Sequence, residues 1–202
     1  MIAYASRTGT LRTLAALRAR GWHLLVSARG RLKSEGFPYA LDNGAWTAFQ
    51  KGEPFDQKAF VKALDKMGRD AEWIVIPDVV GAGAESLAFS HAWLPRLCAF
   101  PKLLLSVQDG MKPADIRPLL GDRIGVFLGG STEWKLGTMR MWGQLCRDTS
   151  AYFHVGRVNS QKRIRYCKDA GAHSFDGTSA TRFAVTIPVL DAEVRQQHLW
   201  GV

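Results

Sequence analysis

Cysteine is scarce in this chain of 202 residues, and its scarcity excludes two kinds of protein. Only Cys98, Cys146 and Cys167 occur, and no two of them form a C-x-x-C pair. An odd number of widely spaced cysteines excludes both a disulfide framework and a cysteine-rich zinc site. Because scarce, unpaired cysteine is typical of a reducing compartment, we expect a cytoplasmic protein.

Long apolar runs are also missing, which argues against a membrane protein. The most apolar long stretch, residues 87–107, contains prolines and charged residues, whereas a membrane-spanning helix needs about 20 predominantly apolar residues in a row. No basic-then-apolar leader opens the sequence, since Arg7 and Arg12 interrupt it early. We therefore expect neither secretion nor membrane insertion.

Acidic residues are in the minority, with 18 Asp plus Glu against 27 Lys plus Arg and a formal net charge of +9. This balance makes a polyanionic partner a reasonable expectation. Hydrophobic residues make up 47% of the chain, enough for a folded core and too many for a disordered protein. Because no linker-like tract divides the sequence, we expect residues 1–202 to form a single domain.

Short apolar runs recur along the chain, and most are followed by a segment with the periodicity of an amphipathic helix. Runs rich in Ile, Val, Leu and aromatic residues predict buried strands. We expect eight strands, at 2–5, 23–27, 39–42, 73–78, 102–108, 124–129, 152–158 and 174–176. The clearest helices are expected at 11–20, 57–67, 85–97 and 161–170.

This alternation of strands and helices predicts parallel strands joined by right-handed crossover connections. Eight units in 202 residues allow about 25 residues each, close to the lower limit for this kind of barrel. A compact (β/α)8 barrel of the TIM type is therefore the favoured α/β fold, and an open doubly wound parallel sheet is the alternative. Neither fold assigns a function by itself.

Polar residues follow most of the predicted strands, at the edge where both folds bind their ligands. Asp42, Asp78 and Asp176 end three different strands, so we expect their carboxylates to gather around one opening. Repulsion and partial burial can hold the pKa values of such carboxylates apart, so that one stays ionised while another carries a proton. This arrangement suits glycosidic-bond chemistry, in which one carboxylate attacks the anomeric carbon.

Five short motifs, each at the end of a predicted strand, resemble those of one known family and occur in the same order. The family's motifs are D-S-G-G-F-Q, V-Q-G-G, L-G-G, M-G-V-G, and F-D-C followed by P-T-R. Their counterparts are D-N-G-A-W at 42–46, V-Q-D-G at 107–110, L-G-G at 128–130, H-V-G-R at 154–157, and F-D-G at 175–177 followed by A-T-R at 180–182. The chain therefore resembles the tRNA-guanine transglycosylase superfamily, especially its DpdA branch, which exchanges guanine in DNA for a 7-deazaguanine.

The resemblance implies a glycosyltransferase that needs no metal or cofactor. Asp176 would be the nucleophile that attacks C1′ of the target nucleoside, and Asp42 would be the general acid/base. Asp78 would read the base, because a carboxylate can accept both the N1 hydrogen and the exocyclic amine of guanine. Gln108 and the backbone N–H of Gly130 would bind the six-position oxygen. The other residues expected at the base site are Gly129 and Gly156.

The departures from that family bear on the substrate. The tRNA enzymes carry a C-x-C-x-x-C zinc subdomain after the nucleophile, whereas no cysteine follows Asp176 here. We therefore expect no zinc subdomain, and DNA becomes the expected polymer, with tRNA as the alternative. Asn43, Ala45 and Asp109 replace family residues, which indicates a reshaped pocket for the free 7-deazaguanine-type base. Homodimers are common in the family, although no residue pattern marks an interface.

Three arginines, Arg7, Arg157 and Arg182, fall in loops after predicted strands. We expect them to contact phosphates beside a flipped nucleotide, because a base must leave the duplex before it can enter such a pocket. Single-stranded or locally opened nucleic acid is therefore the easier substrate. Trp46, close to Asp42, is a candidate for stacking on a base.

Each motif also has a plainer structural explanation. The segments 42–44 and 176–178 are turn sequences, and Asp78 after Pro77 can cap a helix. Residues 129–133 can form a capping box or seat a phosphate, and His154 is expected to be a core histidine. Two other functions stay open: a barrel enzyme that acts on a phosphorylated sugar held by residues 129–131, and a non-catalytic module that binds nucleic acid.

Overall fold

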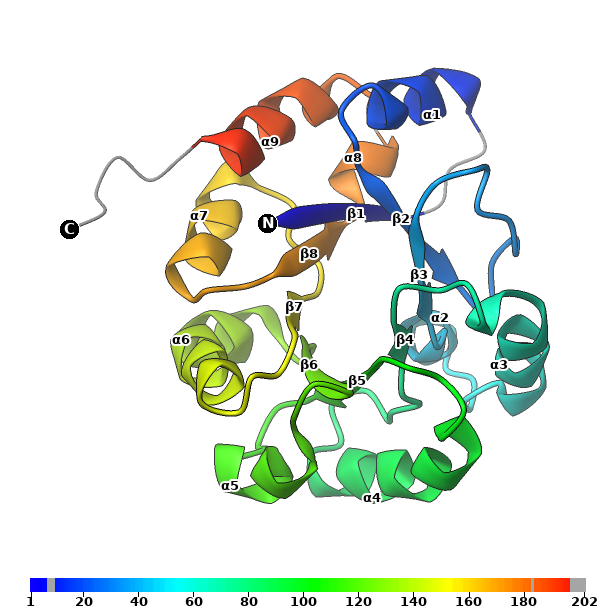
Figure 1. Ribbon diagram of the computed structural model, residues 1–202, viewed down its shortest axis with the longest axis vertical. Coiled ribbons are helices and arrows are strands. Elements are labelled where there is room, and N and C mark those ends of the chain that lie inside the picture. Colours follow the sequence, from blue (N-terminus) through cyan, green and yellow to red (C-terminus); the bar gives the residue numbers. More distant parts are fainter. Residues whose placement is uncertain (7–9, 183, 197–202) are drawn as a thin grey trace.

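The computed structural model describes residues 1–6, 10–182 and 184–196, and its eight parallel strands close into a barrel. Neighbouring strands follow one another in the sequence, and β1 pairs with β8 to complete the ring. The helices surround the strands (Figure 1). The strands are β1 (Ile2–Ser6), β2 (His23–Ser27), β3 (Tyr39–Asp42), β4 (Ile74–Val75), β5 (Leu103–Val107), β6 (Ile124–Leu128), β7 (Phe153–Val155) and β8 (Ser174–Gly177). The predicted (β/α)8 barrel is confirmed, and the open-sheet alternative is wrong.

The helices lie between the strands and after the last of them. They are α1 (Leu11–Arg18), α2 (Ala45–Gln50), α3 (Gln57–Ala63), α4 (Ala84–Trp93), α5 (Pro113–Ile116), α6 (Thr132–Asp148), α7 (Gln161–Asp169), α8 (Ser179–Arg182) and α9 (Thr186–Arg195). A π-helical turn, η1 (Leu64–Gly68), and two 3-10 turns, η2 (Leu94–Leu97) and η3 (Arg117–Leu119), extend or follow them. The four predicted helices begin at the predicted residue or one residue earlier.

Strands β4 to β7 are all shorter than predicted, and the two that shorten most, β4 and β7, end for local reasons. Strand β4 stops because Pro77 has no N–H to continue the ladder; the last backbone bond before it runs from Ile76 to Leu104. Strand β7 stops at Val155 because Arg157 turns the chain with a φ of 59°. Both early stops free the residues that follow to line the mouth of the barrel.

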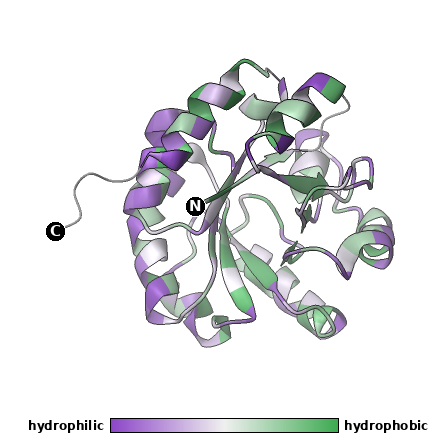
Figure 2. Ribbon diagram, turned by 45° about the horizontal axis from the view of Figure 1, so that its top comes forward, coloured by the Kyte–Doolittle hydropathy of each residue, from purple (hydrophilic) through white to green (hydrophobic). Residues whose placement is uncertain are grey.

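The barrel has an apolar shell outside the strands and a smaller apolar cluster inside. Helix faces that pack on the strands are hydrophobic and the outward faces are polar (Figure 2). Inside the barrel, the buried cluster consists of Tyr4, Leu25, Ala40, Trp73, Val75 and Leu104. Its rings are fixed by polar atoms as well, since Trp73 Nε1 donates to Tyr4 Oη at 3.0 Å. This inner cluster fills the barrel below the cavity, and the carboxyl-terminal end of the barrel stays open.

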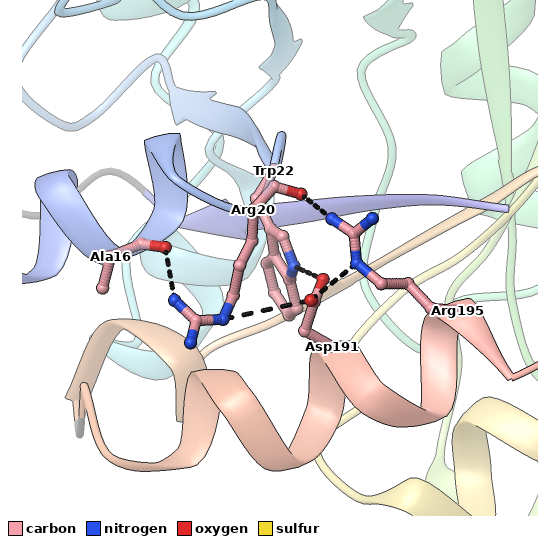
Figure 3. Close-up of polar contacts among 5 residues, drawn as sticks. All are labelled: Ala16, Arg20, Trp22, Asp191 and Arg195. Atoms are coloured by element: carbon pink, nitrogen blue, oxygen red, sulfur yellow. Dashed lines mark hydrogen bonds and ion pairs between the residues drawn. The ribbon is translucent and has the colours of Figure 1, made fainter.

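A polar contact attaches the last described helix to the start of the barrel (Figure 3). Asp191 of α9 accepts a hydrogen bond from Trp22 Nε1 at 2.9 Å and pairs with Arg195 at 2.8 Å. Arg195 also donates to the carbonyl of Arg20 at 2.7 Å. Asp191 is buried, so these partners supply the hydrogen bonds that a buried carboxylate needs. Helix α9 is thereby held against the chain just before β2.

Candidate active site

A cavity of about 480 Å³ opens at the carboxyl-terminal ends of the strands, where ligands bind in barrels of this type. Its lining includes these sequence-predicted residues: Asp42, Asp78, Gln108, Gly129, Gly130, Arg157, Asp176 and Arg182. The predicted convergence of three carboxylates is therefore found. Gly156 lies outside the lining. Arg7 lies outside the described residues.

Asp42 stands at the end of β3, half-buried on the wall of the cavity. Desolvation raises its pKa to about 7, and the charges of Asp176 and Asp78 add to the effect. The Gly44 N–H donates to its carboxylate at 3.1 Å and opposes the shift. The Ser27 hydroxyl also opposes it, although its geometry falls short of a hydrogen bond. Near neutral pH, Asp42 can thus both give and take a proton.

Asp176 belongs to β8, and only 5% of its surface is exposed. Its Oδ1 atom lies 3.1 Å from His154 Nε2 and accepts the Arg157 backbone N–H at 3.3 Å. Among the described residues, none donates a hydrogen bond to the other oxygen, Oδ2. The carboxylate is therefore held through one oxygen, while the side chain lines the cavity.

Asp78 lies deeper, after β4, and is held by two amide side chains. Asn43 Nδ2 donates to its Oδ1 at 2.7 Å, and Gln108 Nε2 donates to its Oδ2 at 2.6 Å. Burial raises the pKa of Asp78, although these bonds oppose the shift. Asn43 also donates to the Ile76 carbonyl at 2.9 Å and accepts from the Ala45 N–H at 2.8 Å. Asn43 thus joins the segment after β3 to the segment after β4, a role that the sequence did not reveal.

Gln108, after β5, uses both ends of its amide within the protein. Its nitrogen also donates to Ser106 Oγ at 2.9 Å. Its oxygen accepts the backbone N–H groups of Gly81 and Gly130, each at 3.2 Å. The two groups expected to bind the six-position oxygen of a base, Gln108 and the Gly130 N–H, are thus bonded to each other. A ligand that uses them must replace this bond.

Gly130 is required by the packing around it. Its φ is 70°, and a Cβ atom there would lie 2.5 Å from Asp109 and 2.6 Å from the Trp134 ring. At Gly156, a Cβ would lie 2.8 Å from the Phe127 ring. Neighbouring side chains therefore occupy the space that a side chain at either glycine would need.

A carboxylate of the protein occupies the start of helix α6. Asp109 accepts the Ser131 N–H at 2.6 Å and the Ser131 hydroxyl at 2.5 Å. Although desolvation alone raises the pKa of Asp109, these bonds lower it overall, so the group is anionic. A helix N-terminus favours negative charge. The phosphate seat considered for residues 129–131 is therefore filled by Asp109.

Arg157 reaches from the end of β7 across the cavity mouth to helix α2. Its guanidinium lies 4.2 Å from the centre of the Trp46 ring and donates to the Gly130 carbonyl. Trp46 stacks on its other neighbour, Phe49, at 5.6 Å between ring centres. Arg182 stands on the exposed rim in α8. The predicted proximity of Trp46 and Arg157 to the carboxylates is found, and both line the cavity.

Two buried basic residues behind the cavity were not predicted as part of the site. Lys135 of α6 donates to the Gly156 carbonyl, and its burial lowers its pKa to about 8. His154 of β7 is fully buried, as expected of a core histidine, and both of its ring nitrogens are hydrogen-bonded. Its strand neighbours Phe153 and Val155 face the outer core, so strand alternation points His154 inward.

The described part of the chain contains neither a metal-ligand cluster nor a membrane-spanning helix. No group of three His, Cys, Asp or Glu side chains stands close enough together to hold a metal ion. No described helix has the length and apolar character needed to span a lipid bilayer.

No family model matches the sequence, and no curated protein matches it either. Among solved structures, RipC from Yersinia pestis is similar, with a TM-score of 0.56 and 14% sequence identity. The alignment covers 96% of this chain and 98% of RipC. At this identity the likeness shows the fold alone, so a function must be argued from the residues of the cavity.

Proposed function

We propose that this protein is a nucleobase transglycosylase that exchanges guanine in DNA for a 7-deazaguanine derivative through a covalent glycosyl-aspartate. One observation carries the proposal: Asp42, whose pKa is raised to about 7, lines the same cavity as the buried carboxylate Asp176. A proton carrier and a held carboxylate facing one space are the two groups that nucleophilic glycosidic-bond chemistry requires.

In the first half of the reaction, Oδ2 of Asp176 attacks C1′ of the target nucleoside. The C1′–N9 bond breaks, its electron pair goes to the departing guanine, and Asp42 donates a proton to a ring nitrogen of that base. In the second half, ionised Asp42 takes the N9 proton of the incoming deazapurine. N9 then attacks C1′, and the electron pair of the C1′–Oδ2 bond returns to Asp176. Asp42 alternates between acid and base, for which a pKa near 7 is suited.

Asp78, Gln108 and Gly130 supply the base-binding edge. Asp78 accepts from the N1 hydrogen and the exocyclic amine, and the Gly130 N–H or the Gln108 amide donates to the six-position oxygen. Each of these groups lines the cavity. Asn43 keeps Asp78 oriented through its 2.7 Å bond. The cavity volume of about 480 Å³ falls within the range of small-ligand sites.

Two features, the net charge and the arginines at the opening, support a nucleic acid as the substrate polymer. The net charge of +9 favours a polyanion, and Arg157 and Arg182 line the opening through which a flipped nucleotide would enter. The phosphorylated-sugar alternative loses its main support, because Asp109 occupies the helix terminus that would hold the phosphate. DNA remains the favoured polymer on the departures in sequence noted above, and tRNA is tested beside it.

The decisive experiment traps the covalent intermediate. The protein is incubated with a guanine-containing single-stranded oligonucleotide or with tRNA, denatured, and examined for a protein–nucleic-acid band; release of labelled guanine is measured with added 7-deazaguanine. We expect an adduct with DNA and base exchange in the wild type, and neither in Asp176→Asn, because an amide is a poor nucleophile.

Asp122→Asn is the matched control, since Asp122 is exposed and precedes β6 at the opposite end of the barrel. It should behave as the wild type does. An adduct with tRNA alone would replace the polymer in the proposal. Binding of DNA without any adduct would overturn the proposal in favour of a binding module, and turnover of a phosphorylated sugar without nucleic acid would overturn it in favour of a metabolic enzyme.

A further inference from the structure

A buried histidine connects the proposed nucleophile to the strand beside it. His154 Nε2 lies 3.1 Å from Asp176 Oδ1, and His154 Nδ1 lies 2.7 Å from Ser174 Oγ. The register of β7 against β8 pairs His154 with Ser174, and Asp176 is two residues farther along the same face of β8. His154 and Ser174 are fully buried and Asp176 is nearly so. These three residues form one hydrogen-bonded chain inside the barrel.

The imidazole is held in one orientation by the rings around it. Phe127 stacks on it at 4.8 Å between ring centres, and Trp73 lies 4.7 Å away on a tilted plane. Tyr4 meets it edge-on at 5.8 Å. Since interiors are close-packed, the ring has no room to turn over. His154 Nε2 is therefore fixed toward Asp176.

The protonation of the ring follows from its surroundings. Burial lowers the pKa of His154, and the nearby Lys135 charge adds to this, although Asp176 opposes both. The ring is thus neutral and carries one N–H. An ionised carboxylate only accepts hydrogen bonds, so the hydrogen lies on Nε2. Nδ1 then accepts from the Ser174 hydroxyl, which can donate to it.

We propose that His154 is a positioning residue for the nucleophile: its Nε2–H, together with the Arg157 backbone N–H, holds Oδ1 of Asp176 and so turns Oδ2 toward C1′. This inference rests on the proposed function and extends it by naming the groups that present the reactive oxygen. The two donors also stabilise the carboxylate that reforms when the C1′–Oδ2 bond breaks, because hydrogen bonds to an anion are stronger than those to a neutral ester. No proton passes through His154.

Kinetics of substitutions at His154 test this role. His154→Phe keeps a ring among the aromatic neighbours but donates no hydrogen bond, whereas His154→Gln can place an N–H near the position of Nε2. We expect kcat for base exchange to fall about 10²-fold in His154→Phe, as is typical when a reacting group is misplaced. KM should change little, and His154→Gln should recover part of kcat. Unchanged kcat in a folded His154→Phe would overturn the proposal.

A matched control separates positioning from packing. Leu104→Ala disturbs the same buried cluster inside the barrel, but Leu104 neither lines the cavity nor bonds a nitrogen of His154. We expect Leu104→Ala to lower the melting temperature while kcat stays near the wild-type value. A fall of kcat in Leu104→Ala equal to that in His154→Phe would mean that packing alone is responsible, and would overturn the positioning role.

A readout without turnover keeps the test independent of the enzyme assay. The 15N resonances of the His154 ring distinguish the two neutral tautomers, and we expect the Nε2–H form in the wild type. In Ser174→Ala, which removes the bond to Nδ1, the Nε2–H form should persist, because Asp176 still accepts from Nε2. The Nδ1–H form in the wild type would overturn the proposal, because Nε2 would then need a proton from Asp176. If the wild type forms no adduct with nucleic acid, the proposed function fails, and the ring resonances still decide whether His154 donates to Asp176.

Discussion

Asp42 differs from the other two carboxylates of the cavity in how few hydrogen bonds it receives. Asp78 accepts two amide N–H groups, and Asp176 accepts from His154 and from the Arg157 backbone. Asp42 has one backbone donor, the Gly44 N–H. With so little to offset desolvation, its pKa rises to about 7. Asp42 can thus exchange its proton near neutral pH because few hydrogen-bond donors stabilise its ionised form.

The cost of this arrangement should appear in the stability of the protein. Between pH 3.8 and about 7, folded Asp42 keeps a proton that the unfolded chain releases. The folded state therefore binds more protons, and the free energy of unfolding falls as the pH rises through this window. Asp42→Asn should remove the fall and stabilise the protein at pH 8 by up to about 4 kcal/mol relative to the wild type, at 1.36 kcal/mol per pKa unit.

Urea unfolding of wild type and Asp42→Asn at pH 4 and pH 8 measures this difference. The gain should be absent or reversed at pH 4, where the wild-type carboxyl is already protonated. An equal difference at both pH values would show that Asp42 has an ordinary pKa. The same variant should lose base exchange, because an amide neither gives nor takes the proton.

At the scale of elements, helix α6 shows how closely the outer layer fits the barrel. It contains two glycines with opposite surroundings. A Cβ at Gly143 would lie 1.9 Å from the Ala170 carbonyl oxygen at the end of α7, whereas a Cβ at Gly137 would meet nothing within 4 Å. Gly143 thus permits α6 to approach the end of α7, and Gly137 has no such role.

The two glycines form a matched pair for mutagenesis. Gly143→Ala should destabilise the protein by about 1–3 kcal/mol, because an added methyl group forces the helices apart. Gly137→Ala should stabilise it by about 0.5–1 kcal/mol, since alanine is the better helix former. Thermal unfolding of both variants measures the effects, and equal shifts of the melting temperature would contradict this account of the packing.

Elements were predicted best where the sequence itself marks their ends. Strand β2 and strand β3 have the predicted bounds, because turn residues directly follow each apolar run. Strand β4 was predicted at 73–78, and only two of those residues pair as a strand. The apolar run continues past the ladder because Ile76 remains in the core, so hydrophobicity alone did not locate the stop at Pro77.

The predicted side chains of the cavity were found together because each follows a strand, and parallel strands end on one rim. Partners that lie behind the rim could not be found in this way. Asn43 occurs in a turn sequence, and its two bonds to the segment after β4 depend on side-chain geometry. The contact of His154 with Asp176 depends on the register between β7 and β8, which a sequence does not state.

At the scale of the whole molecule, part of the excess positive charge lies around the cavity. Much of the basic surface lies on helical faces, where charge is simply solvated. Arg157 and Arg182 line the mouth of the cavity, and Arg31 lines a smaller hollow of about 150 Å³ that also touches Asp42. Under the proposed function, cations around one opening would give a strand of nucleic acid a path to the carboxylates.

Affinity for single-stranded DNA should therefore depend on salt. We expect the logarithm of the association constant to fall linearly with the logarithm of salt concentration, with a slope set by the number of phosphate contacts. Arg182→Ala should reduce that slope by about 1. Arg140→Ala, on the exposed face of α6, should leave it unchanged. Fluorescence anisotropy over a salt series provides the measurement, and a flat response in the wild type would rule out phosphate contacts as the source of affinity.

The hydrogen bond between Gln108 and Gly130 has a consequence for ligand selectivity. Within the protein, the side-chain amide of Gln108 is already bonded to Asp78, Ser106 and two backbone amides. An entering ring gains only if it returns every bond that it displaces. An analogue that lacks one acceptor would leave a buried donor of the protein without a hydrogen bond, and its binding would be weaker. Selectivity would then come less from the shape of the ligand than from the match between the hydrogen bonds it makes and those it displaces.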